Sequence, residues 1–90
     1  MGEVDDNRNA DRGDAEVEAT VLRKLLLLHP AQVTVEELIR DVATDPEEFA
    51  ERDAIERAVR DLGRAGLVNR NGEFAIPSRA ALRFGELLGG

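Results

Sequence analysis

The sequence predicts a single α+β domain, mostly α-helical, with a three-helix core, a two-stranded β-hairpin and a short C-terminal helix. Apolar residues recur at helical spacing in three segments between residues 15 and 65. Asn71-Gly72 separates two short apolar runs, which is the strongest short-range signal of a hairpin. Ser78 follows the second run as a helix N-cap, and 90 residues leave room for one domain.

Residues 1–13 form a polar and acidic segment with one isolated aliphatic side chain, Val4. Such a segment has too little apolar surface to offset the entropy lost on ordering. We therefore expect a disordered acidic tail at residues 1–13 and a folded domain at residues 14–88. The tail is either a solvated terminus or a mimic of nucleic-acid charge that screens a binding face.

The first helix is predicted from about Ala15 to Leu28, with Asp14 as its N-cap. His29-Pro30 ends it, because a residue before proline is disfavoured in the α conformation. Leu27 lies outside the apolar arc. The expected buried stripe consists of Val17, Val21, Leu25 and Leu28.

The second helix is predicted to begin after Thr34, which forms a capping box with Glu37, and to end near Ala43. Its expected buried stripe is Val35, Leu38, Ile39 and Val42.

A third helix is predicted from about Ala54 to Ala65, after a short turn at residues 46–51 and a bend near Arg52. The bend is inferred because a straight helix cannot bury both Phe49 and the apolar face of the residues that follow it. That face consists of Ile55, Ala58, Val59 and Leu62.

The hairpin is expected to have a type I′ turn at Asn71-Gly72, with Arg70 opposite Glu73 as a cross-strand ion pair. In the same register Leu67 faces Ile76 and Asn69 faces Phe74. In the last helix, Ala81, Phe84 and Leu88 are expected to share the buried stripe, and Leu82 lies on the opposite side.

Residues 15–77 resemble the winged helix-turn-helix family. The segment Ala54–Val68 carries the resemblance, because it looks like the end of a recognition helix that runs through Gly66 into the first strand of a wing. The resemblance implies a bacterial transcription-regulator type of domain that binds double-stranded DNA, with helix 54–65 in the major groove. The family often has a tight turn before this helix, whereas Thr44–Arg52 here adds an acidic insertion.

The resemblance places candidate DNA contacts on the third helix and on the hairpin. The candidates are Arg57, Arg60, Arg64, Arg70 and Arg52. The first three fall on one exposed stripe, where guanidinium groups can bind base edges or phosphates. The alternative is a solvated helix face with ion pairs, because Asp53 precedes Arg57 by four residues and Glu56 precedes Arg60 likewise.

The charge distribution favours a second hypothesis, a protein-interaction module on the same scaffold that uses its acidic surface. The net charge is −7, but residues 51–90 carry seven basic and six acidic side chains. The acidity opposes DNA binding, and the basic C-terminal half weakens that objection. Leu27 and Leu82, which lie off the predicted core stripes, are candidate contacts of a homodimer.

Other classes of function find no support in the sequence. It has no cysteine, no glycine-rich phosphate loop and one histidine, His29, so we expect no enzyme, no metal site and no small-molecule cofactor. No apolar run approaches the length that spans a bilayer, so no membrane partner is expected. The absence of cysteine fits a cytoplasmic location, and 11 arginines against one lysine are typical of a GC-rich bacterial genome.

Overall fold

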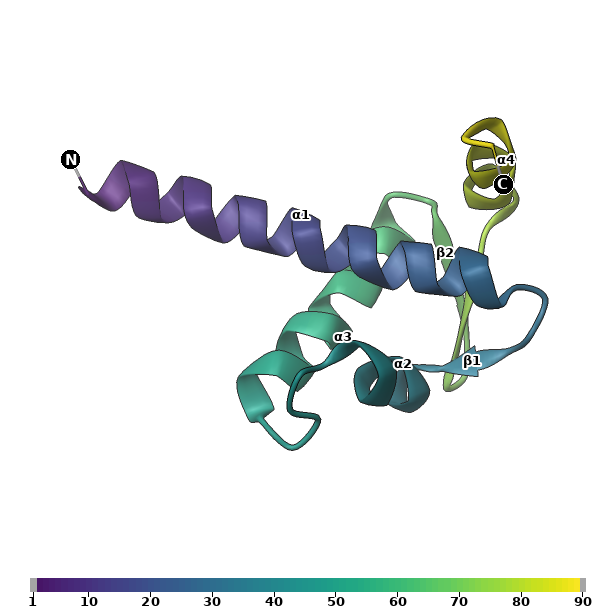
Figure 1. The fold of residues 1–90 in the computed structure, drawn as a ribbon, viewed down its shortest axis with the longest axis horizontal. Helices are drawn as coiled ribbons and strands as arrows, with labels where there is room; N and C mark the ends of the chain where they lie inside the picture. Colours follow the sequence, from purple (N-terminus) through teal and green to yellow (C-terminus); the bar gives the residue numbers. More distant parts are fainter. Residues whose placement is uncertain (1, 90) are drawn as a thin grey trace.

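The protein has an α+β fold that is mostly helical, with four helices and a small antiparallel sheet (Figure 1). The computed structural model describes the backbone of residues 2–89 and the side chains of residues 13–89. Its elements are α1 (Gly2–Leu28), β1 (Val33–Thr34), α2 (Val35–Val42), α3 (Phe49–Arg64), β2 (Val68–Asn71), β3 (Phe74–Pro77) and α4 (Arg79–Leu87).

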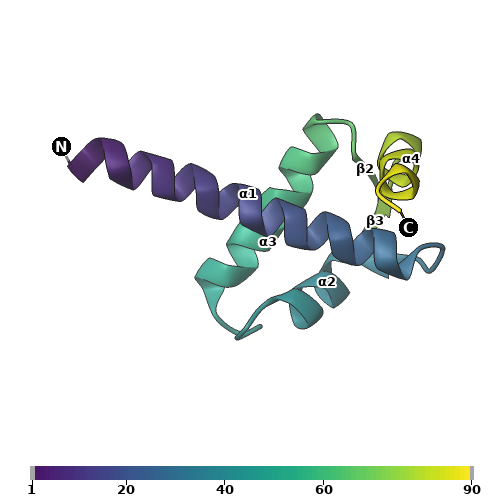
Figure 2. The same cartoon turned by 45° about the horizontal axis from the view of Figure 1, so that its top comes forward.

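Helix α1 packs across α3, and both views of the ribbon show this crossing (Figures 1 and 2). Val21 and Leu25 of α1 are buried, and Val17 and Leu28 pack at the edge of the core. Leu27 is 77% exposed. The predicted stripe of this helix and the outward position of Leu27 are therefore confirmed.

The N-terminal bound of α1 differs from the predicted one. The helix begins at Gly2 instead of near Ala15, and its N-terminal part extends beyond the other elements (Figure 1). Residues 3–28 contain no proline, and once a helix is nucleated each further residue adds a hydrogen bond. Gly13 costs about 1 kcal/mol relative to alanine in a helix interior and does not by itself end one.

Helix α2 confirms the predicted capping box. The Glu37 amide donates to Thr34 Oγ1 at 3.1 Å, and the Thr34 amide donates to Glu37 Oε1 at 3.1 Å. Leu38 and Ile39 are fully buried, while Val35 and Val42 pack at the edge of the core.

Helix α3 runs without a break from Phe49 to Arg64, so the predicted bend near Arg52 is wrong, and the predicted turn at residues 46–51 ends before Phe49. The bend was inferred on the assumption that Phe49 is buried, but Phe49 is 81% exposed. A straight helix therefore meets no conflict. The predicted apolar face is confirmed, because Ile55, Ala58, Val59 and Leu62 are all buried.

The sheet has three strands in the order β1-β3-β2, one more than the sequence predicted. Val33 pairs with Ala75 and Thr34 with Phe74. Val33 and the cap residue Thr34 are too short a run to identify as a strand from the sequence. These two residues form a strand because the edge of β3 that does not pair with β2 offers unpaired backbone groups.

The hairpin at residues 68–77 is confirmed, but its register differs by two residues from the predicted one. Asn71 pairs with Phe74 and Arg70 with Ala75, so Arg70 does not lie opposite Glu73. The two turn residues are Gly72 and Glu73, and Gly72 has a φ of +62°. Glycine with positive φ at the first central position is the pattern of a type II′ turn, not of the predicted type I′ turn.

Helix α4 begins at the predicted cap, where the Ala81 amide donates to Ser78 Oγ at 3.2 Å. Its predicted stripe is wrong beyond Ala81, because Phe84 is 54% and Leu88 72% exposed. The side of α4 that carries Gly85 faces α1. A Cβ on Gly85 would lie 3.4 Å from Leu26 Cδ1, and this close approach decides which side of α4 is covered.

None of the helices among residues 2–89 combines the length and the apolar character needed to cross a membrane.

Candidate nucleic-acid interface

An open groove of about 840 Å³ lies between the start of α2, the exposed face of α3 and the β2–β3 hairpin. Three of the five predicted arginines line it, namely Arg60 and Arg64 from α3 and Arg70 from β2. We call this feature the arginine groove. Val59 and Val68 form part of its floor, so the groove rests directly on the hydrophobic core.

Arg60 and Arg64 are exposed one helical turn apart on α3. Arg64 Nη1 lies 3.6 Å from Asp61 Oδ1, but its side chain is 75% exposed, so this pair restrains it weakly. Among the side chains that the structure describes, Arg60 makes no ion pair, and the predicted i,i+4 pair with Glu56 is not formed. Both guanidinium groups are accessible from the groove.

Arg70 reaches the groove from the hairpin. Its Nη2 donates to the carbonyl oxygen of Gly72 at 2.9 Å, which holds the side chain against the turn. The predicted ion pair with Glu73 is not formed, because the two-residue change of register places Ala75 opposite Arg70. A shift by two residues preserves the face on which each side chain lies, so Arg70 and Ala75 share one face of the sheet.

Arg57 does not line the arginine groove, although the sequence placed it on one stripe with Arg60 and Arg64. Its Nη1 binds Asp53 Oδ2 at 3.1 Å, the i,i+4 pair that the sequence predicted. Its Nη2 lies 3.4 Å from Asp14 Oδ1 of α1. Helix α1 crosses α3 on this side, and the contact with Asp14 holds Arg57 away from the groove. Helical periodicity does not reveal which helix packs on this side of α3.

Arg52 likewise does not line the arginine groove, and its side chain binds groups of the fold itself. Its Nη2 binds Glu36 Oε1 of α2 at 2.6 Å, and its Nη1 donates to the Pro46 carbonyl at 3.2 Å. The hydrogen bond to Glu36 raises the pKa of Arg52, and the same bond lowers the pKa of Glu36 below its usual range. This contact joins the start of α2 to the first turn of α3.

Three glutamates that the sequence analysis did not assign to the site also line the arginine groove. They are Glu36 from α2, Glu56 from α3 and Glu73 from the hairpin turn. The formal charges of the lining residues therefore cancel, and the groove is a patchwork instead of a continuous basic surface. Their convergence depends on three separate elements, so no local sequence signal marks them as a set.

The acidic insertion between α2 and α3 is fastened to the start of α3. The Glu51 carboxylate accepts the Thr44 amide at 2.9 Å and the Asp45 amide at 2.9 Å. The Glu47 amide donates to Asp45 Oδ1 at 3.0 Å. The carboxylates of Glu51 and Asp45 thus accept hydrogen bonds from backbone amides of the insertion itself.

Within residues 13–89, no group of three or more histidine, aspartate or glutamate side chains is arranged to hold a metal ion. Comparison of this chain with protein-family models, with curated proteins and with solved structures found no significant match.

Proposed function

We propose that this chain is a non-catalytic DNA-binding domain of the winged helix-turn-helix type, with α3 as the recognition helix and the β2–β3 hairpin as the wing. Support comes from the order of the elements, in which α2 and α3 precede a tight hairpin. An exposed helix face of this kind fits the major groove of double-stranded DNA.

The observation that carries the proposal is that Arg60, Arg64 and Arg70 line one open groove from two different elements. Guanidinium groups bind the O6 and N7 atoms of guanine or phosphate oxygens through two parallel hydrogen bonds. Two arginines on α3 suit a helix that enters the DNA major groove, and one arginine on the hairpin suits a wing that contacts the DNA backbone.

The glutamates of the groove limit the affinity. Non-specific DNA binding draws its free energy from phosphates that are neutralised and counterions that are released. With three arginines balanced by Glu36, Glu56 and Glu73, one domain neutralises few phosphates. We expect weak binding to arbitrary duplexes and a preference for a site on which the arginines read bases.

Fluorescence anisotropy with a pool of mixed-sequence duplexes at low salt tests the proposal. We expect salt-dependent binding at protein concentrations up to about 50 μM, within the usual range of non-specific affinities. On the preferred duplex, Arg60→Ala should cost about 1–3 kcal/mol. The matched control is Arg40→Ala, which removes an exposed arginine of α2 outside the groove.

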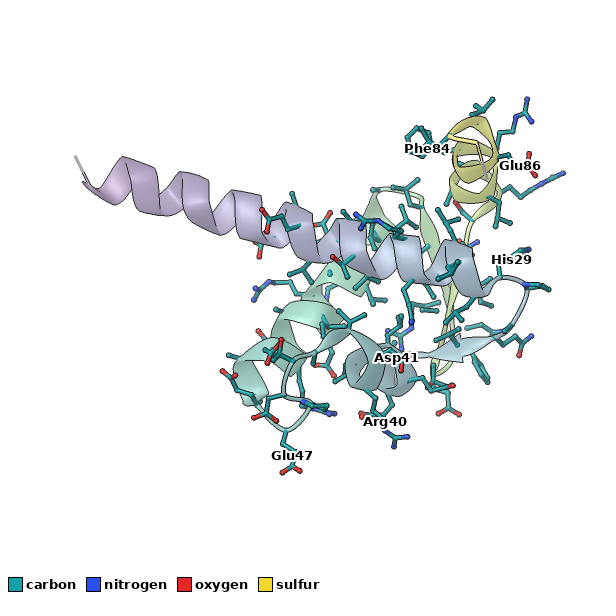
Figure 3. All side chains as sticks on the ribbon, viewed as in Figure 1. His29, Arg40, Asp41, Glu47, Phe84 and Glu86 are labelled. Atoms are coloured by element: carbon teal, nitrogen blue, oxygen red, sulfur yellow. The ribbon has the colours of Figure 1, made fainter. Side chains whose placement is uncertain are left out.

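Absence of salt-dependent binding, or an equal loss for Arg60→Ala and Arg40→Ala, would reject the proposal. Arg40 projects from α2 on the face away from α1 (Figure 3) and does not line the groove, so its removal controls for the loss of one positive charge.

A protein-interaction module is the second candidate, and the charge-balanced groove is the observation that favours it. Protein partners tolerate mixed charge, whereas duplex DNA is uniformly anionic. Glu47 and Glu48 add an exposed acidic edge beside the start of α3. Capture of a lysate protein that persists after nuclease treatment favours this candidate, and loss of the captured protein after nuclease rejects it.

A further inference from the structure

Exposed large apolar side chains gather on one part of the molecule. Leu27, Phe84, Leu87 and Leu88 are between 54% and 77% exposed, and they lie on the C-terminal part of α1 and on α4 or its cap. An isolated exposed leucine is ordinary in a monomer, whereas a contiguous cluster marks an interaction surface. Phe84 and Glu86 project from different sides of α4, so Phe84 lies away from the side of this helix that carries Glu86 (Figure 3).

Between α1 and α4 the cluster borders an open groove of about 620 Å³, which we call the apolar groove. Its apolar lining consists of Leu26, Leu27, Leu82 and Leu88, together with Gly85. Because Gly85 lacks a side chain, α4 sits close to Leu26 and the groove is bounded by two nearly touching helices. The arginine groove shares no lining residue with it.

The charged groups of the apolar groove are self-complementary. Arg23 lies on the α1 wall and Glu86 on the α4 wall. A two-fold symmetric interface contains each contact twice, once in each direction. A contact of Arg23 in one copy with Glu86 in the other is therefore repeated between Glu86 of the first copy and Arg23 of the second. Glu86 already pairs with Arg83 at 3.2 Å on its own helix, but both side chains are about 70% exposed and can exchange partners.

We propose that two copies of this chain associate through the apolar groove, with Arg23 of each copy against Glu86 of the other. Leu27 and Leu88 of each copy cover the apolar lining of its counterpart. A standard stable interface takes roughly 800 Å² from each partner. This is about one eighth of the 6354 Å² surface of the chain. The inference does not depend on DNA binding.

Sedimentation equilibrium over a range of micromolar concentrations tests the association. We expect the mass to approach twice the 9.9 kDa of one chain. Leu27→Glu should weaken association by at least about tenfold, because a charge would enter an apolar contact. Phe49→Glu is the matched control, since Phe49 is equally exposed but lies at the start of α3. Far-ultraviolet circular dichroism establishes that both variants remain folded.

A charge exchange tests the geometry. Arg23→Glu and Glu86→Arg should each associate more weakly than the parent chain, because like charges meet twice across the two-fold axis. An equimolar mixture of the two variants should recover association, since both cross-copy contacts again join opposite charges. Contacts within one chain cannot produce recovery on mixing.

A monomeric mass at every concentration would overturn the proposal. Unchanged association of Leu27→Glu, or a mixture that associates no better than the separate variants, would overturn it as well.

Discussion

Ser78 joins the start of α4 to the end of α3 through one hydroxyl group. Its Oγ accepts the Ala81 amide at 3.2 Å and donates to the Gly66 carbonyl at 2.7 Å. The residue is only 9% exposed, so water cannot readily replace either hydrogen bond.

Ser78→Ala should lower the free energy of unfolding by about 1–2 kcal/mol, because it removes the N-cap and leaves the Gly66 carbonyl without this donor. Urea denaturation measures the change. Arg79→Ala, one residue further along at an exposed position, should change it by less than about 0.5 kcal/mol. Equal midpoints for Ser78→Ala and the parent chain would contradict the expectation.

Gly72 and Gly13 should respond to alanine with opposite signs. Gly72 has a φ of +62°, where an L side chain is strained, so Gly72→Ala should destabilise the protein by about 1 kcal/mol. Gly13 lies within α1 with open space around its Cβ position, so Gly13→Ala should stabilise by about 0.5–1 kcal/mol. Thermal unfolding of both variants provides the comparison, and shifts of the same sign would refute it.

Among the elements, the connection between α2 and α3 depends on the Glu51 carboxylate, which binds two loop amides. Glu51→Ala should destabilise by about 1–2 kcal/mol, because both amides lose a charged acceptor. Glu48→Ala is the control, since Glu48 makes no side-chain cap hydrogen bond at the start of α3. Denaturation midpoints measure both, and an equal effect of the two would show that Glu51 acts only through its charge.

The contact between α2 and α3 also predicts a pH dependence. The Arg52 hydrogen bond lowers the pKa of Glu36, so its stabilising contribution is present above pH 4.5 and is lost as pH falls through the folded-state pKa. Glu36→Gln should therefore be less stable than the parent chain at pH 7, and the difference should close in acid.

Glu18 supplies the opposite case for the same measurement. Partial burial and the nearby carboxylates of Asp61 and Asp14 raise its pKa. Its ionised form is penalised above that pKa, and the penalty disappears below pH 4.5. Glu18→Gln should therefore be more stable than the parent chain at pH 7 and equal to it in acid. Matching pH profiles of the two variants would contradict at least one of the two assignments.

At the scale of the whole molecule, the balanced charge of the arginine groove predicts a shallow salt dependence of DNA binding. If Arg60, Arg64 and Arg70 all contact phosphates, the logarithm of affinity should fall with the logarithm of salt concentration with a slope of about −3. Arg64→Ala should reduce the magnitude of that slope by about 1. Anisotropy titrations at several salt concentrations measure it, and a slope near zero would rule out phosphate contacts.

Several local interactions were predicted correctly from the sequence. The capping box of Thr34 and Glu37, the cap at Ser78 and the buried face of α3 each involve residues within a few positions of one another. Their geometry depends on backbone hydrogen bonds and helical periodicity, which are properties of the segment itself. The exposed positions of Arg60 and Arg64 on α3 follow from the same helical periodicity.

Tertiary packing decided the rest. Three features depend on residues that lie far apart in the chain. They are the exposure of Phe49, the pairing of Val33 with β3 and the contact of Arg57 with α1. The charge balance of the arginine groove likewise arises where three elements meet. Residue patterns determine which side of a segment is apolar, because that follows from local periodicity. They do not determine which partner covers that side, because the choice minimises the free energy of the whole fold.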